Sequence, residues 1–179
     1  SKDTRRRSCQ CAAMELDKTN EAHVVAVHEA AHALAVERTG ATITNFWMKS
    51  HEAGWEGDVS HGGRAGLSDF DAAELDRMGY LAGPAAEERF AGRCDFDECA
   101  RDLALAESIS EQLPADRESL DVARARVGAL LEDEATWAAV ATLARKLLDR
   151  PERESVSHEE VEEVVVSLLG PPPAPGWTI

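Results

Sequence analysis

The residues with the clearest capacity for chemistry lie in the run His28-Glu29-Ala30-Ala31-His32. On a helix, positions four apart project from one face, so both imidazoles can reach the same metal ion at about 2.0–2.1 Å. Glu29 is turned about 100° from His28, which places its carboxylate beside such an ion rather than on it. There it can take a proton from a metal-activated water. The pattern therefore predicts a catalytic zinc site.

A catalytic zinc site needs a third protein ligand and an open position for water. The metzincin pattern would place Gly at 35 and His at 38, and the sequence has Ala35 and Arg38, which excludes that class. Spacing alone does not choose among the remaining carboxylates, although a glutamate on a following helix would suit a common pattern. The candidates are Glu87, Glu88, Asp95, Asp97 and Asp102.

Helical and extended segments must position these groups. Apolar residues recur at helical spacing from Glu21 to Arg38, with Thr19 or Asn20 as the N-cap and Gly40 as the stop. Residues 41–50 are rich in β-branched and aromatic types, and a glycine-bearing turn leads to a short extended run around residues 58–60. We therefore expect a helix followed by a hairpin.

The second half of the chain is expected to be helical, after a loop over residues 61–69. The helices are predicted over residues 71–91, 98–113, 116–131, 134–149 and 157–169, the last opened by the capping box Ser157-His158-Glu159-Glu160. The predicted fold is mostly α with a small β-hairpin, an α+β class. Residues 1–20 are expected to form a polar arm, residues 21–169 one domain, and residues 170–179 a flexible Pro-rich tail.

Acidic residues outnumber basic ones by 34 to 19 in the 179 residues, a formal net charge of −15. Binding to nucleic acid or to an anionic membrane needs clustered positive charge, so this balance argues against both. It favours neutral or basic unfolded substrates, or a basic partner. No apolar run approaches the roughly 18 residues of a membrane span. No signal-peptide core follows the basic N-terminus, so the cytoplasm is the expected compartment.

Four cysteines occur as two close pairs, Cys9 with Cys11 and Cys94 with Cys99. They are too sparse for a disulfide scaffold, so free thiols are expected. A four-thiolate zinc site is the alternative, but the usual C-x2-C spacing is absent. A further hypothesis is that Cys9 or Cys11 occupies the open zinc position and holds the protein latent.

Four segments in the same order resemble the peptidase domain of the FtsH-type zinc proteases, membrane-anchored AAA+ enzymes of bacteria and organelles. The segments are VHEAAHAL, the hairpin ending in GWEGDVSH, ELDRMGYLAGPAAEERFAG and ARDLALAESI. The resemblance covers roughly residues 21–168. The ordered set, rather than any single motif, makes it specific.

The resemblance implies an FtsH-like peptidase fold with a zincin-type active-site helix. It matches His28 and His32 to the two zinc histidines and Glu29 to the general base. Asp102, in the Asp-Leu-x-x-Ala run, matches the aspartate that serves as third ligand. The implied cofactor is one catalytic Zn²⁺.

The resemblance also implies supporting roles around the site. Glu87 and Glu88 become residues that pack or orient the ligands, or plain solvated carboxylates. The strand near Gly57-Asp58-Val59 resembles the edge that pairs with an extended polypeptide substrate. Family relatives assemble as rings, which implies a homo-oligomer or a separate ATPase partner.

Three departures from the family pattern stand out. Ala31 replaces a typical Gly, Pro84 lies in a turn where Gly followed by Arg is usual, and no P-loop is present. The predicted function is an ATP-independent zinc endopeptidase that acts on unfolded or flexible polypeptides. The alternative is a non-catalytic, zinc-stabilised domain that binds a polypeptide or a partner. Glu29 distinguishes the two, because a purely structural site has no use for that carboxylate.

Overall fold

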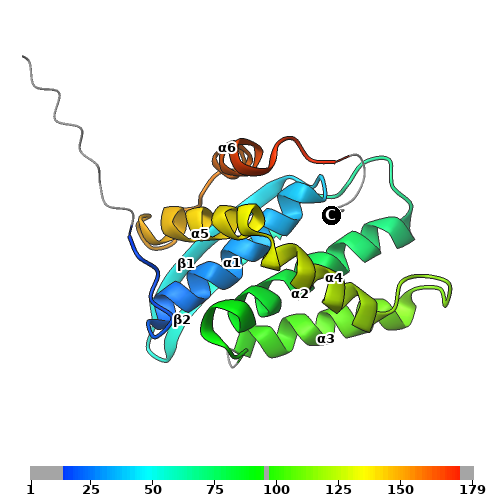
Figure 1. Cartoon of the computed structure of the whole chain (residues 1–179), viewed down its shortest axis with the longest axis horizontal. Helices are drawn as coiled ribbons and strands as arrows, with labels where there is room; N and C mark the ends of the chain where they lie inside the picture. The colour runs from blue at the N-terminus through cyan, green and yellow to red at the C-terminus, as the bar shows by residue number, and fades with distance from the viewer. Residues whose placement is uncertain (1–13, 95–96, 174–179) are drawn as a thin grey trace, which may run out of the picture.

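The computed structural model describes residues 14–94 and 97–173, where the chain is mostly helical with a two-stranded antiparallel sheet (Figure 1). The expected fold class is therefore confirmed. Most of the predicted arm (1–20) and of the predicted tail (170–179) lies outside the described residues. In chain order the elements are α1 (Glu21–Arg38), β1 (Ile43–His51), β2 (Gly54–His61), α2 (Asp69–Ala91), α3 (Asp97–Gln112), α4 (Leu120–Glu132), α5 (Glu134–Leu148) and α6 (His158–Leu169).

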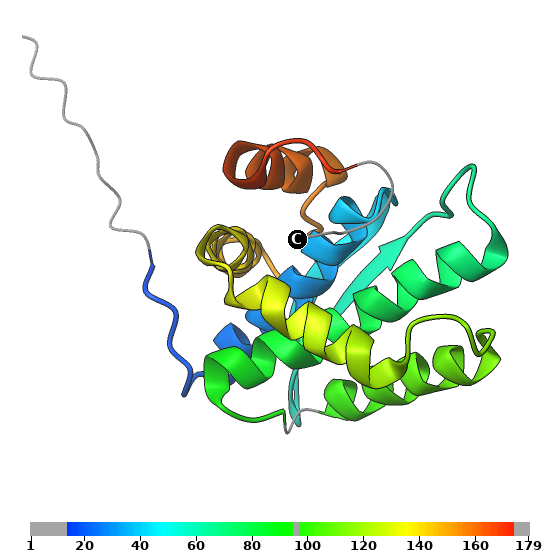
Figure 2. The same ribbon diagram turned by 45° about the vertical axis from the view of Figure 1, so that its right-hand side comes forward.

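Helix α1 lies at the centre of the molecule, where it contacts α2, α5, α6 and the hairpin (Figures 1 and 2). It has the predicted bounds, and the side chain of Asn20 caps it by accepting the backbone N–H of Ala22. Its apolar side chains are buried on all sides, among them Val25, Val27 and Leu34. Because buried polar groups need partners, any polar side chain on this helix must be matched by a neighbouring element.

The other helices form two groups around α1. Helices α2, α3 and α4 pack together on one flank, and α5 packs with α6 on the other. The predicted capping box at Ser157 and Glu160 is present at the start of α6. Helix α4 begins at Leu120, four residues later than predicted, because the Ser119 side chain accepts the N–H of Val122 and caps the helix there.

The hairpin is longer than predicted. Met48 lies opposite Gly57 and His51 opposite Gly54, so only residues 52 and 53 form the turn and β2 begins before the expected run at 58–60. Gly54 has a φ of 142°, a conformation that side-chain-bearing residues rarely adopt, which lets the chain reverse this tightly.

Only one of the two sheet edges is covered within the described part of the chain. The segment between α5 and α6 runs along β1, where the N–H of Arg153 donates to Met48 O (3.0 Å) and that of Val156 to Phe46 O (2.8 Å). The Ser155 hydroxyl accepts the N–H of Phe46. No described strand pairs with the outer edge of β2. That edge keeps its capacity for main-chain hydrogen bonds.

Pro84 lies inside α2, so the helix predicted over residues 71–91 is confirmed and the turn that the family pattern places at Pro84 is absent. Proline has no N–H, which leaves the carbonyl of Tyr80 without its usual helical partner. The helix nevertheless continues to Ala91, because Leu81, Ala82 and Ala86 around the proline are buried in the core. Among the described helices, none has the length and apolar character to span a membrane.

Candidate metal centre

Helix α1 presents His28 and His32 one turn apart, and α3 brings Asp102 to them. Nε2 of His28 lies 2.9 Å from Asp102 Oδ2, Nε2 of His32 lies 3.0 Å from the same oxygen, and the two nitrogens are 3.0 Å apart. Three ligand atoms on two elements, 74 residues apart in sequence, thus meet at one point. With this spacing, one ion could contact all three at about 2.0–2.2 Å.

The other described carboxylate candidates do not contact both histidines. Glu87 is buried and lies behind His28, while Glu88 and Asp97 are exposed. Asp95 lies outside the described residues. Among the described candidates, Asp102 is therefore the carboxylate that contacts both histidines.

Both histidines are oriented by acceptors on their far side. Nδ1 of His28 lies 3.1 Å from Glu87 Oε2, and Nδ1 of His32 lies 2.8 Å from the carbonyl of Gly79. An acceptor at Nδ1 holds a proton there, so Nε2 is the nitrogen that each histidine turns toward the centre. Glu87 therefore contacts a histidine of the centre, whereas Glu88 is exposed.

The charges at the centre are strongly coupled. Burial lowers the pKa of His28, but hydrogen bonds to Asp102 and Glu87 and the charge of Glu29 outweigh it and raise this pKa to about 10. Burial raises the pKa of Asp102, but hydrogen bonds from the two histidines outweigh it and lower this pKa to about 2. In the metal-free protein at neutral pH, His28 is therefore an imidazolium paired with the Asp102 carboxylate.

A metal ion that binds Nε2 of His28 must displace this proton, so we expect metal affinity to rise with pH. Below a pKa of about 10 the proton is present, and each pH unit should therefore strengthen binding about tenfold through His28 alone. Chelator competition at pH 6, 7 and 8, corrected for the chelator's own protonation, measures this slope. A flat profile would contradict the protonated state assigned to His28.

The same proton affects the stability of the metal-free protein. The folded pKa of His28 lies above its ordinary value of 6.5, so its stabilising contribution is complete below pH 6.5 and is lost between pH 6.5 and about 10. We expect the melting temperature of the metal-free protein to fall over this interval. Metal-loaded protein should lack this decline, because the metal has replaced the proton.

Glu29 lies beside the three ligand atoms. It is buried, and its carboxylate oxygen lies within 4.8 Å of a ring nitrogen of His28 and of a carboxylate oxygen of Glu98. Burial raises the pKa of Glu29, the charge of His28 opposes this, and the Glu98 carboxylate raises it further, to well above the ordinary value. A carboxyl group with a raised pKa is suited to accept a proton and return it near neutral pH.

The backbone of β2 passes directly over the Glu29 carboxyl group. A Cβ added at Gly57 would lie 2.7 Å from Glu29 Cδ and 2.9 Å from its Oε1. No side chain fits at this strand position unless Glu29 moves. The absence of a side chain at Gly57 therefore allows the Glu29 carboxyl group and the edge strand to lie in close contact.

A similar close approach occurs on α2. A Cβ added at Gly83 would lie 2.6 Å from His28 Nε2 and 2.7 Å from His32 Cε1, and still closer to His32 Nε2. The helix backbone at Gly83 therefore borders the space in front of both ligand nitrogens.

A cleft of about 370 Å³ opens at the centre. Glu29, His32 and Asp102 lie in its wall, residues 57–61 of β2 form one side, and residues of α2 and α3 form the other. The unpaired edge strand and two of the three ligand side chains, His32 and Asp102, therefore share one cleft.

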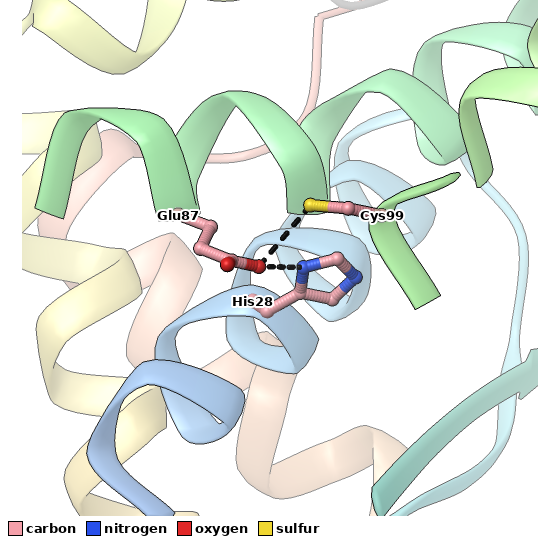
Figure 3. Close-up of side chains that lie close together, drawn as sticks. All are labelled: His28, Glu87 and Cys99. Atoms are coloured by element: carbon pink, nitrogen blue, oxygen red, sulfur yellow. Dashed lines mark hydrogen bonds and ion pairs between the residues drawn. The ribbon is translucent and has the colours of Figure 1, made fainter. Parts of the chain in front are cut away.

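The expectation of free thiols was wrong for one pair. Cys94 and Cys99 form a disulfide that links the chain after α2 to the first turn of α3. The sulfur of Cys99 lies 3.2 Å from Glu87 Oε2, the same oxygen that contacts His28 (Figure 3). A four-thiolate site with these two residues is excluded, and Cys9 and Cys11 lie outside the described residues.

Sequence reasoning missed several members of the centre. Gly79 and Gly83, spaced one turn apart within a predicted helix, carried a usable signal, because glycine destabilises a helix interior and its presence there indicates close approach of another group. Glu98 and the contact of Cys99 with Glu87 carried none, because both depend on how α3 docks on α2.

The metal assignment rests on the donor set itself. Two imidazole nitrogens and one carboxylate oxygen, all within hydrogen-bonding distance of one another, are three acceptors that need a proton or a cation between them. Two imidazoles with one carboxylate and an open position fit zinc, whereas calcium and magnesium prefer all-oxygen sites. No protein-family model matches the chain, and no curated protein matches it.

Proposed function

We propose that this chain is a zinc-dependent endopeptidase, similar to the peptidase domain of FtsH-type proteases, that hydrolyses peptide bonds in unfolded or flexible polypeptides. The observation that carries the proposal is the meeting of His28 Nε2, His32 Nε2 and Asp102 Oδ2 within 3.0 Å, with both Nδ1 atoms already engaged. Three ligands on one side leave the cleft side open for water and substrate.

Zinc at such a site lowers the pKa of water toward about 7 and polarises the scissile carbonyl. Glu29 accepts the proton of the attacking water and later donates it to the leaving amine, which its raised pKa favours. Glu87 keeps the His28 ring in the tautomer that offers Nε2, and the Gly79 carbonyl does the same for His32. No nucleophilic side chain is needed.

The substrate class follows from the unpaired edge of β2. An extended segment can add to this edge through main-chain hydrogen bonds, which places its backbone across the cleft beside Glu29. Recognition through the main chain requires an unfolded or flexible segment and depends little on side-chain identity. The acidity of the chain favours neutral or basic segments.

The sequence contains no P-loop, the motif that binds the phosphates of ATP. Hydrolysis of an already unfolded chain needs no motor. We therefore propose that this chain cleaves without ATP. Folded substrates would require a separate ATPase partner.

Metal removal tests the proposal. The zinc-loaded protein should contain one zinc ion per chain and cleave casein, which is largely unfolded. Chelation should abolish cleavage while far-UV circular dichroism stays unchanged, and one equivalent of zinc should restore cleavage. Undiminished cleavage by metal-free protein, or failure to bind zinc, would overturn the proposal.

The same experiment distinguishes the endopeptidase from the alternative function, a non-catalytic binding domain. That function predicts stoichiometric zinc, casein bound but not cleaved, and unfolding on chelation. The buried Glu29 beside the ligands argues against it, because burying a carboxyl group is costly and a structural site would gain nothing from it.

A further inference from the structure

The Cys94–Cys99 disulfide lies directly behind the candidate metal centre. The side chains of His28, Glu87 and Cys99 form one buried chain of contacts, with exposed fractions of 0%, 2% and 1%. Glu87 Oε2 lies 3.1 Å from His28 Nδ1 and 3.2 Å from Cys99 Sγ, so both atoms approach the same oxygen (Figure 3). A change at the sulfur therefore acts on the carboxylate that orients a metal ligand.

The disulfide is also attached to α3, the helix that carries the third ligand. Cys99 lies in the first turn of α3, three residues before Asp102, so the two side chains are neighbours on that helix. The bond to Cys94, with a Cα–Cα distance of 6.1 Å, links this turn to the end of α2. Breaking the bond releases the covalent connection between the helix of Asp102 and the helix of Glu87.

We propose that Cys94 and Cys99 form a thiol–disulfide switch that sets the metal affinity of the centre. In the oxidised state Cys99 has no proton to donate, so His28 alone donates to Glu87 Oε2 and the full carboxylate charge acts on its ring. In the reduced state the Cys99 thiol donates to the same oxygen and draws charge away from the imidazole. Both this change and the loss of the covalent link weaken metal binding.

A dithiol can reduce the Cys94–Cys99 disulfide by thiol–disulfide exchange. A thiolate of the dithiol attacks the sulfur of Cys94, which is partly exposed, and Cys99 leaves as a thiolate that takes up a proton. The second thiol of the dithiol then displaces Cys94, which gives two cysteine thiols and one oxidised dithiol. Two electrons and two protons pass to the protein, and the reverse reaction restores the disulfide.

The inference rests on the proposed zinc site, and its test uses zinc binding rather than hydrolysis. Full-length protein with Cys9→Ser and Cys11→Ser is equilibrated in mixtures of reduced and oxidised dithiothreitol. The reagent is removed, thiols are counted by alkylation and mass spectrometry, and zinc affinity is measured by competition with a chromophoric chelator. The two thiols should appear together, and the reduced protein should bind zinc about tenfold more weakly.

Reduction could also change zinc affinity because the new thiols bind zinc themselves, and a matched variant distinguishes this from the switch. Adding Cys94→Ser leaves one thiol at Cys99 and no covalent link, so its zinc affinity should equal that of the reduced protein and should not respond to dithiothreitol. The switch is overturned if the oxidised and reduced proteins bind zinc with equal affinity, or if no disulfide forms in the most oxidising dithiothreitol mixture. Either result leaves the proposed function standing. Failure of both states to bind zinc overturns the proposed function together with the switch.

Discussion

Replacing Glu29 with Gln is expected to lower the turnover of casein by about 10²–10⁴-fold, the usual contribution of a positioned general base. Glutamine has nearly the same shape, so it keeps the contact with the backbone at Gly57. It cannot accept the proton of the attacking water. It also removes a buried carboxyl group beside Glu98, so the variant should be at least as stable as the wild type.

Zinc content and turnover must be measured together for Glu29→Gln. One zinc per chain with lost turnover is the expected result, because the ligands His28, His32 and Asp102 are unchanged. Glu37→Gln is the matched control, since it alters another buried carboxyl group on α1 that lies outside the cleft wall. Wild-type turnover by zinc-loaded Glu29→Gln would show that another group is the base, or that a contaminating protease cleaves the casein.

Gly83→Ala is expected to abolish tight zinc binding, although it adds a single methyl group. That methyl would lie 2.6 Å from His28 Nε2 and closer still to His32 Nε2, in the space a metal must occupy. The backbone of α2 cannot retreat freely, because the neighbouring Leu81, Ala82 and Ala86 are buried. The histidines must therefore rotate away, which breaks their contacts with Glu87 and Gly79 and disperses the three ligand atoms.

The control for this variant is Gly128→Ala on α4, where an added Cβ meets nothing within 4 Å. Alanine is favoured over glycine in a helix interior by up to about 1 kcal/mol, so this control should bind zinc normally and melt at an equal or higher temperature. Zinc affinity is read by chelator competition in both variants. Wild-type affinity in Gly83→Ala would mean that α2 does not border the metal position.

Helix α1 could be predicted from sequence because its signal is local. Residues 28–32 fix the spacing of the two histidines and Glu29, and the apolar residues around them fix the helix. The third ligand could not be derived in this way. Five carboxylates remained open, since the choice depends on where α3 docks, and Asp102 was singled out by the family resemblance alone.

The other differences between the predicted and the observed structure also arise from tertiary contacts. The start of β2 at Gly54 depends on pairing with β1, and the continuity of α2 through Pro84 depends on buried neighbours that offset the lost hydrogen bond. The pairing of Cys94 with Cys99 requires the end of α2 to meet the start of α3. The local sequence carries no information on any of these tertiary contacts.

The unpaired edge of β2 has a consequence for how copies of the chain meet one another. An open strand edge can pair with the same edge of a second molecule, which would lead to aggregation and would block the cleft. Asp58 and Glu56, the latter ion-paired with Lys49 of β1, lie on this strand, and two copies placed edge to edge would bring these carboxylates close together. An incoming neutral or basic segment meets no such repulsion. We therefore expect the acidic strand to discourage self-association through this edge, and we expect this protection to weaken at high salt.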